Sequence, residues 1–153
     1  MCVFCGLLSS CVKPSVQDIF IKSTDAPDGV YVFDLDLSDS LSVYDILIYS
    51  RTDAAPRALK RIPPIKLSVE WFAPAAADTV AGEQVQSRSR SLIPALTDTV
   101  ALAAVKHGSV IQPYRTGVNP SVRGLWSLRM SVLNVPESFR GIGIICERKD
   151  GTR

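Results

Sequence analysis

Three segments of the chain alternate apolar and polar side chains with a period of two. In the first, residues 30–37, the apolar positions are Tyr31, Phe33, Leu35 and Leu37 and the polar ones are Asp34 and Asp36. Residues 65–71 and 126–132 repeat this alternation. Because successive side chains of an extended strand point to opposite faces, the period is that of a strand with one buried face. The pattern constrains the chain to a β-rich fold.

Four shorter or less regular apolar runs, at 16–22, 43–49, 109–114 and 142–148, are predicted to add strands to the same antiparallel system. A turn is predicted immediately before the segment 30–37, where the sequence reads Asp25-Ala-Pro-Asp-Gly29. Ten prolines and nine glycines in the chain fit a fold with many such turns.

One segment, between Ser91 and His107, has apolar side chains at helical spacing. The stripe consists of Leu92, Ile93, Leu96, Val100, Ala103 and Ala104. Pro94 fits the first turn, Lys106 and His107 complement the negative end of a helix dipole, and Gly108 suits a left-handed cap. We therefore expect one principal α-helix over about 91–107.

The fold class predicted from these elements is α+β and β-rich, an antiparallel sheet or small sandwich with that one helix. At 153 residues the chain has the size of one domain. Residues 1–14 are predicted to form a flexible, cysteine-containing N-terminal segment and residues 15–153 a single β-rich domain. The stretches 74–90 and 51–64 are expected to be long exposed connections.

Cysteine and hydropathy patterns bear on the compartment. The sequence has no run of about 18 apolar residues, and its first thirteen residues lack the basic region of a signal peptide. Of four cysteines, three crowd into the first eleven residues and the fourth is Cys146, unlike the spread framework of a secreted fold. We expect reduced cysteines and a cytosolic protein.

The residues that most often perform catalysis are scarce. His107 is the single histidine, and its expected place in the last turn of a helix explains it structurally. Cys146 lies within the apolar run 142–146 and is expected to be buried and inert. Asp34 and Asp36 share one face of a strand that should be solvated, with cation binding as the less favoured alternative. The sequence predicts no enzyme activity, no cofactor, no metal site and no small-molecule substrate.

The N-terminal segment has three candidate roles. Cys2 and Cys5 have the spacing of metal ligands, but a zinc site would need distant partners. Reversible acylation of Cys2 or Cys5, beside Phe4 and two leucines, would place the segment at a membrane surface. The segment is otherwise a mobile hydrophobic end, or one that packs on a neighbouring subunit.

Charge is distributed unevenly along the chain. Residues 1–50 hold two Lys/Arg against seven Asp, whereas residues 51–153 hold fifteen Lys/Arg against eight Asp/Glu. The second part includes a segment whose four cations, Arg51, Arg57, Lys60 and Arg61, suit phosphate groups or anionic lipid. Few aromatic residues accompany them, so membrane or protein contact is slightly favoured over base stacking.

Two C-terminal pieces resemble parts of rhabdovirus matrix proteins. They are Ser131-Val-Leu-Asn-Val-Pro-Glu-Ser-Phe-Arg140, which contains a leucine-asparagine-valine-proline segment, and Gly143-Ile-Ile-Cys-Glu-Arg-Lys-Asp-Gly151, a late strand that ends in charged residues and glycine. The resemblance implies a non-enzymatic protein that self-associates, contacts the inner membrane leaflet and condenses a viral nucleocapsid. Arg51 to Arg61 and the cysteine-bearing terminus would then be membrane or nucleocapsid contacts.

The function expected from the sequence is thus a matrix-like viral structural protein. It would form homo-oligomers through strand edges or its N-terminus and bridge an anionic membrane surface to the nucleocapsid or RNA, in the virion, the host cytoplasm and at the inner membrane surface. The alternative is a viral coat or movement-type protein that binds RNA. A third hypothesis is an enzyme whose catalytic residues the sequence does not pair.

Overall fold

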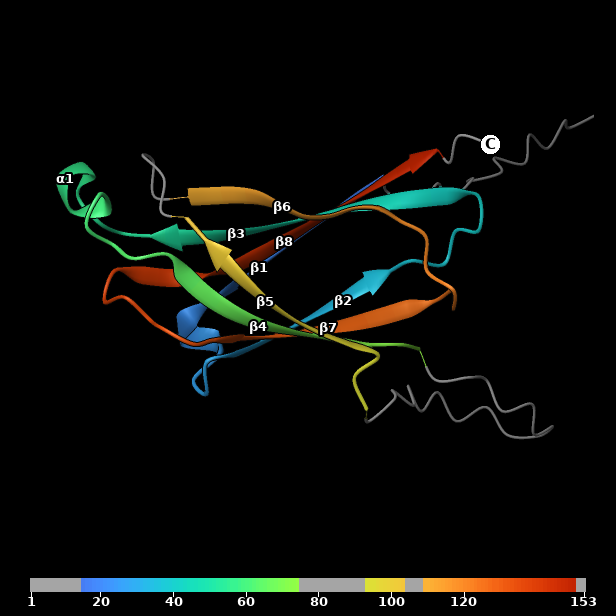
Figure 1. Ribbon diagram of the computed structural model, residues 1–153, viewed down its shortest axis with the longest axis horizontal. Helices are drawn as coiled ribbons and strands as arrows, with labels where there is room; N and C mark the ends of the chain where they lie inside the picture. The colour runs from blue at the N-terminus through green and yellow to red at the C-terminus, as the bar shows by residue number, and fades with distance from the viewer. Residues whose placement is uncertain (1–14, 75–92, 104–108, 151–153) are drawn as a thin grey trace, which may run out of the picture.

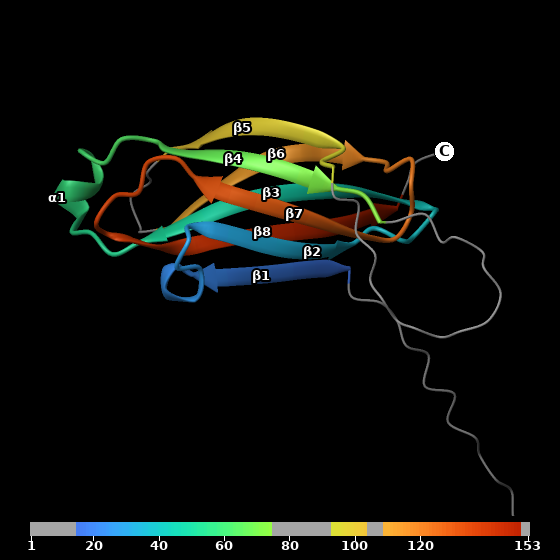
Figure 2. The same cartoon turned by 90° about the horizontal axis from the view of Figure 1, so that it is seen from below.

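The computed structural model of the protein describes residues 15–74, 93–103 and 109–150, which form a sandwich of two four-stranded antiparallel sheets (Figures 1 and 2). Sheet A has the strand order β1-β8-β3-β6 and sheet B the order β2-β7-β4-β5. The strands of sheet A are β1 (Val16–Lys22), β8 (Phe139–Asp150), β3 (Ser42–Thr52) and β6 (Ser109–Val118). Those of sheet B are β2 (Val30–Asp36), β7 (Leu125–Val132), β4 (Ile65–Phe72) and β5 (Leu96–Leu102).

The strand pairs show how the chain winds. β1 pairs with β8, β2 with β7, β3 with β6 and β4 with β5. These pairs are those of one long hairpin whose turn lies between β4 and β5. When this hairpin folds over on itself, β3 also pairs with β8 and β4 with β7, and these pairs complete the two four-stranded sheets. This strand order is that of the eight-stranded jelly roll.

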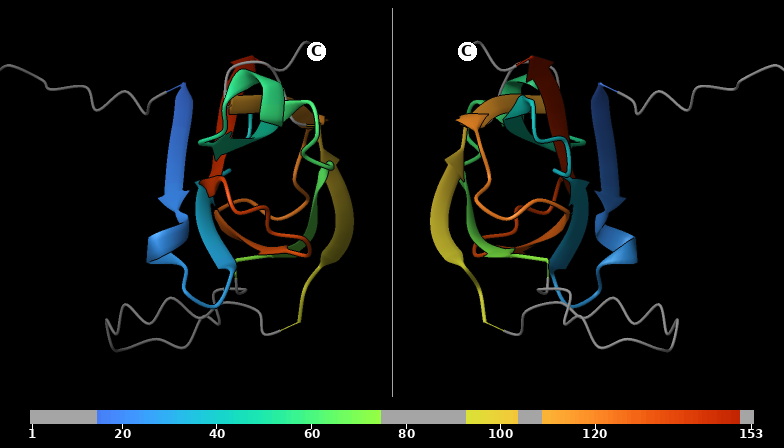
Figure 3. Two further views of the ribbon diagram at one scale, coloured as in Figure 1. Left: turned by 90° about the vertical axis from the view of Figure 1, so that its left-hand side faces the viewer. Right: turned by 90° about the vertical axis from the view of Figure 1, so that its right-hand side faces the viewer.

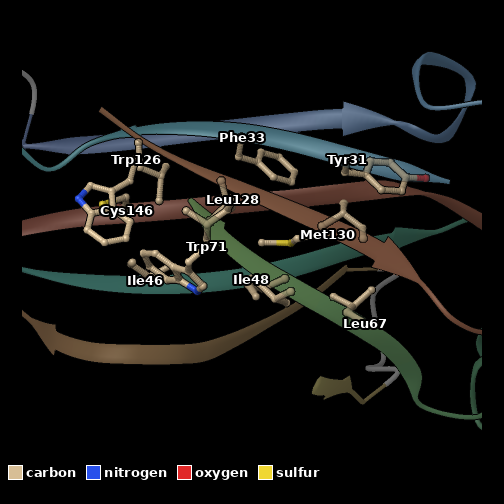
Figure 4. Close-up of a cluster of buried hydrophobic side chains, with 14 of the residues drawn as sticks. Tyr31, Phe33, Ile46, Ile48, Leu67, Trp71, Trp126, Leu128, Met130 and Cys146 are labelled. Atoms are coloured by element: carbon tan, nitrogen blue, oxygen red, sulfur yellow. The ribbon is translucent and has the colours of Figure 1, made fainter. Parts of the chain in front are cut away.

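The core lies between the sheets (Figure 4), where the inward side chains of both interdigitate. Its fully buried members include Phe33, Ile46, Leu67, Leu128 and Ile144. The rings of Trp71 and Trp126 meet edge to face with centroids 5.9 Å apart, near one end of this layer. The alternation that predicted half-buried strands at 30–37, 65–71 and 126–132 therefore selects the core.

Short helical turns connect some of the strands. η1 (Ser23–Asp25) and the turn that follows it link β1 to β2, and Gly29 has the positive φ of 68° that the predicted turn requires. The α-helix α1 (Pro56–Leu59) links β3 to β4, begins with proline in its first turn and buries Leu59. It lies at one end of the long axis (Figures 1 and 3), which we call the α1 end.

The predicted strands are confirmed, and the sandwich was one of the two expected arrangements. The helix predicted over about 91–107 is wrong where the structure describes it, because Leu96–Leu102 form strand β5; residues 91, 92 and 104–107 lie outside the described residues. The strand turns partly buried Val100 and fully buried Leu102 toward the core at a period of two, and β-branched Thr97, Thr99 and Val100 favour it. Pairing with β4 therefore determines the structure of this segment, although its apolar residues have helical spacing.

The two other connections differ in outcome. Of residues 51–64, predicted as a connection, the first two complete β3 and four form α1. Residues 75–90 of the second predicted connection lie outside the described residues, as do residues 1–14.

Candidate functional site

The outer face of sheet A has an apolar centre between charged borders. The register places its outward residues in rows that cross β1, β8, β3 and β6. From the α1 end, the rows are Lys22, Gly141 and Arg51; then Phe20, Gly143, Tyr49 and Ile111; then Asp18, Ile145, Leu47 and Pro113; then Val16, Glu147 and Asp45. Ile111 is 58% exposed and Val16 is 47% exposed. Among the described residues, no further element packs on this face.

Tyr49 organises the centre of this face. Its ring stacks on Phe20 at a centroid distance of 5.9 Å, and its hydroxyl donates a hydrogen bond of 2.8 Å to Asp18 Oδ1. The guanidinium of Arg51 lies 4.5 Å from the centroid of the Phe20 ring. Burial, together with the hydrogen bond to Asp18, raises the pKa of Tyr49 to about 12. The cluster is a stacked aromatic pair with a cation at its border.

The outer face of sheet B has a different character. Its outward positions are Val30, Val32, Asp34, Asp36, Lys66, Ser68, Glu70, Phe72, Thr97, Thr99, Ala101, Leu125, Ser127, Arg129 and Ser131. Most are hydroxyl-bearing or charged, and the guanidinium of Arg129 lies 5.8 Å from the centroid of the Phe72 ring. This face therefore has the polar outer surface that a solvated sheet normally presents, whereas sheet A does not.

The four predicted contact cations are all exposed, but the structure divides them. Arg57 lies on α1, and Lys60 and Arg61 follow it directly, so these three occupy one short segment at the α1 end. Arg51 lies on β3 at the border of the sheet A face. Other exposed cations of this end are Lys22, Lys66 and Arg140, and Arg140 pairs with Asp53 at 3.2 Å.

A bulge in β6 builds a polar network where the edges of the two sheets meet. Ile46 pairs with Arg115 and Leu47 with Pro113, so Tyr114 is an extra residue on β6. The Tyr114 hydroxyl accepts a hydrogen bond of 2.9 Å from Trp71 Nε1 and donates one of 2.7 Å to Asp98 Oδ2. Arg115 forms an ion pair with the same oxygen. The hydrogen bonds from Tyr114 and Arg115 hold the pKa of Asp98 below its usual value.

A cleft of about 660 Å³ lies beside this network. Its walls include Trp71, Trp126, Leu96, Val118 and Arg115. The aromatic and aliphatic lining suits a small apolar group, with Arg115 as the one cation of the lining residues that the structure describes. Tyr114 bridges Trp71 and Asp98 by hydrogen bonds, so the polar atoms of these three side chains already have partners within the fold.

The remaining candidates from the sequence can also be placed. Cys146 is fully buried, as expected, and burial is the main cause that raises the pKa of its thiol to about 12. Asp34 and Asp36 are half-buried, less solvated than predicted, and the described residues contain no group of three potential metal ligands from His, Cys, Asp and Glu. Cys2, Cys5 and His107 lie outside the described residues.

The sheet A face was missed by the sequence reasoning, which assigned assembly to strand edges and the N-terminus. Its signal was present in the runs Ile46-Leu-Ile48 and Ile142-Gly-Ile-Ile145, where apolar residues occupy both parities of a strand. Such a run indicates a strand that is apolar on both faces. Only the register shows that the outward residues of four strands form one surface.

No helix in the described part of the chain is long and apolar enough to cross a bilayer. No protein-family model matches the chain, and no curated protein matches it significantly in sequence. Inference about function therefore depends on the surfaces described above.

Proposed function

We propose that this chain is a non-enzymatic, self-assembling structural protein of the viral coat type, with the outer face of sheet A as its joining surface. The observation that carries the proposal is the apolar centre of that face, where exposed Ile111 and half-buried Leu47 and Ile145 point away from the core. Extended apolar surface is rare on monomers that do not associate, and it usually marks an interface with another protein.

The strand order supports the same function by analogy. The eight-stranded jelly roll is a recurrent fold of viral capsid proteins, although lectins and cupins share it. A fold alone does not select a function, so the surface chemistry has to do so. The outer face of sheet A is apolar at its centre, whereas the outer face of sheet B is polar. This difference suits a subunit that binds its neighbours through one face.

RNA is the proposed polyanionic partner, bound at the α1 end. Arg57, Lys60 and Arg61 are exposed in one short segment, where their charges can contact successive phosphates. Arg51 is left out of this contact, because its guanidinium lies over the Phe20 ring on sheet A. The matrix-like hypothesis would instead direct the same cations to anionic lipid.

The two pieces that resemble matrix proteins lie mainly in strands β7 and β8, and several of their residues are in the core. Ser131 and Val132 end β7, and Phe139, Ile142, Ile144 and Cys146 are buried residues of β8. Structural roles at these positions are sufficient to explain the residues. We therefore prefer the coat-type protein, and keep the matrix-like function as the outcome that lipid binding would favour.

Two measurements test the proposal on the full chain. Sedimentation velocity over a range of protein concentrations should show assembly beyond the monomer, and a protein that stays monomeric at high concentration in low salt would contradict it. Titration with single-stranded RNA and with anionic phosphatidylserine vesicles should show RNA binding that weakens as salt rises. Binding to the vesicles with negligible RNA binding would replace the coat-type function with the matrix-like one.

A further inference from the structure

The charged borders of the sheet A face lie on opposite sides of its apolar centre. Lys22 and Arg51 flank Gly141 in the row nearest the α1 end. In the last of the four rows, farthest from the α1 end, Asp45 and Val16 flank Glu147. Lys149 neutralises Asp45 within the chain, which leaves Glu147 as the acid at the centre of that row. The face is therefore cationic at one end and acidic at the other.

We propose that a second copy of this chain occupies the face, in a dimer whose two-fold axis runs across the strands between the Tyr49 and Leu47 rows. The inference rests on the proposed function, because it names the partner of the same surface. A closed two-fold contact requires a surface that is complementary to itself. An axis parallel to the strands would place the cationic rows against each other, whereas an axis across the strands exchanges the two ends.

This axis makes the rows complementary one by one. The row of Lys22 and Arg51 meets the row of Glu147, so each Glu147 faces Gly141 of the other copy between two cations. The row of Tyr49 meets the row of Leu47, and Ile111 meets Pro113. The apolar residues of these two rows are then buried at the centre, with Asp18 of β1 opposite Phe20, and the ion pairs form at the rim, which is the usual anatomy of an interface. Twist in both sheets would set the strands at about 30° to one another.

A charge-swap experiment tests this arrangement. The variants are Arg51→Glu and Glu147→Arg, each of which places like charges opposite each other in its own homodimer. In an equimolar mixture, the new glutamate of one variant lies diagonally beside the new arginine of the other, and the unchanged Glu147 lies diagonally beside the unchanged Arg51. We expect each variant alone to raise the dimer Kd about tenfold or more, and the mixture to recover a Kd close to that of the wild type.

Two further variants complete the test by sedimentation equilibrium. Ile145→Glu, at the apolar centre, should raise the dimer Kd more than either charge swap. Arg129→Glu is the matched control, because Arg129 is an exposed cation on the outer face of sheet B and should leave the Kd unchanged. Circular dichroism checks that each variant folds, and recovery in the mixture itself requires two folded partners.

The outcomes separate this inference from the proposed function. Recovery of the dimer in the mixture supports it. The inference is overturned if both single variants dimerise as the wild type does, or if the mixture stays as monomeric as its components. Larger assemblies that form normally in all the variants would overturn the sheet A dimer and leave self-assembly intact. A wild-type chain that is monomeric at every concentration would contradict both.

Discussion

The ring of Tyr49 lies directly over Gly143, so closely that a Cβ on residue 143 would lie 2.0 Å from Tyr49 Cζ. The two residues are cross-strand partners on β3 and β8. Glycine is required here for space, because Gly143 lacks the positive φ that Gly29 and Gly141 have.

Substitution Gly143→Ala is expected to destabilise the protein by about 1–3 kcal/mol, because the added methyl group must displace a ring that stacks on Phe20 and is 5% exposed. Urea denaturation of the variant and the wild type measures the difference. The control is the same substitution in a Tyr49→Ala background, where the ring is absent and the added methyl group should be tolerated. Equal losses in both backgrounds would show that the Tyr49 ring is not the cause.

The ion pair between Asp98 and Arg115 predicts a pH dependence. Because hydrogen bonds from Tyr114 and Arg115 lower the pKa of Asp98 in the folded state, this carboxylate contributes stability above its unfolded pKa of about 3.9. That contribution is lost as the pH falls through the lower folded pKa. Asp98→Asn should therefore be less stable than the wild type at pH 7, and the gap should narrow toward pH 3. Urea midpoints at pH 7, 5 and 3 measure it, and a gap independent of pH would contradict the assignment.

Gln17 links β1, an edge strand of sheet A, to β2, an edge strand of sheet B. Its side-chain amide donates a hydrogen bond of 3.1 Å to the carbonyl of Asp36, and its carbonyl oxygen accepts one of 2.9 Å from the amide of Asp36. Gln17→Ala removes both and should lower the free energy of unfolding by about 1–3 kcal/mol. Gln17→Glu keeps the acceptor but sets a carboxylate oxygen against the Asp36 carbonyl in place of the donor, so it should also be less stable than the wild type. If alanine and glutamate were both neutral, the bridge would be unimportant for stability.

The strands were predictable because each needs only a local pattern. Alternation in 30–37, 65–71 and 126–132 reflects burial of one face, and the structure places the strands β2, β4 and β7 there. β5 was not predictable in the same way. Its Leu96 and Val100 are four residues apart, a spacing that suits a helix, and only pairing with β4 determines the strand.

The candidate surfaces were predictable only in part. Exposure of Arg57, Lys60 and Arg61 follows from their charge and from the proline-containing segment that carries them. The Tyr114, Arg115 and Asp98 network depends on a bulge and on two sheet edges that are distant in sequence. The sheet A face likewise depends on the register of four strands, which no single segment encodes.

Cys146 gives a test of the core that does not depend on denaturant. In a chain with Cys2→Ser, Cys5→Ser and Cys11→Ser, Cys146 is the one remaining thiol. It is fully buried and its pKa is raised to about 12, so the reactive thiolate is scarce at pH 8 and shielded from reagent. Labelling by a disulfide reagent should be roughly a thousandfold slower than for an exposed cysteine, and should accelerate when the protein unfolds. Complete labelling within seconds of a protein whose circular dichroism is unchanged would mean that β8 opens readily, and would place Cys146 outside a closed core.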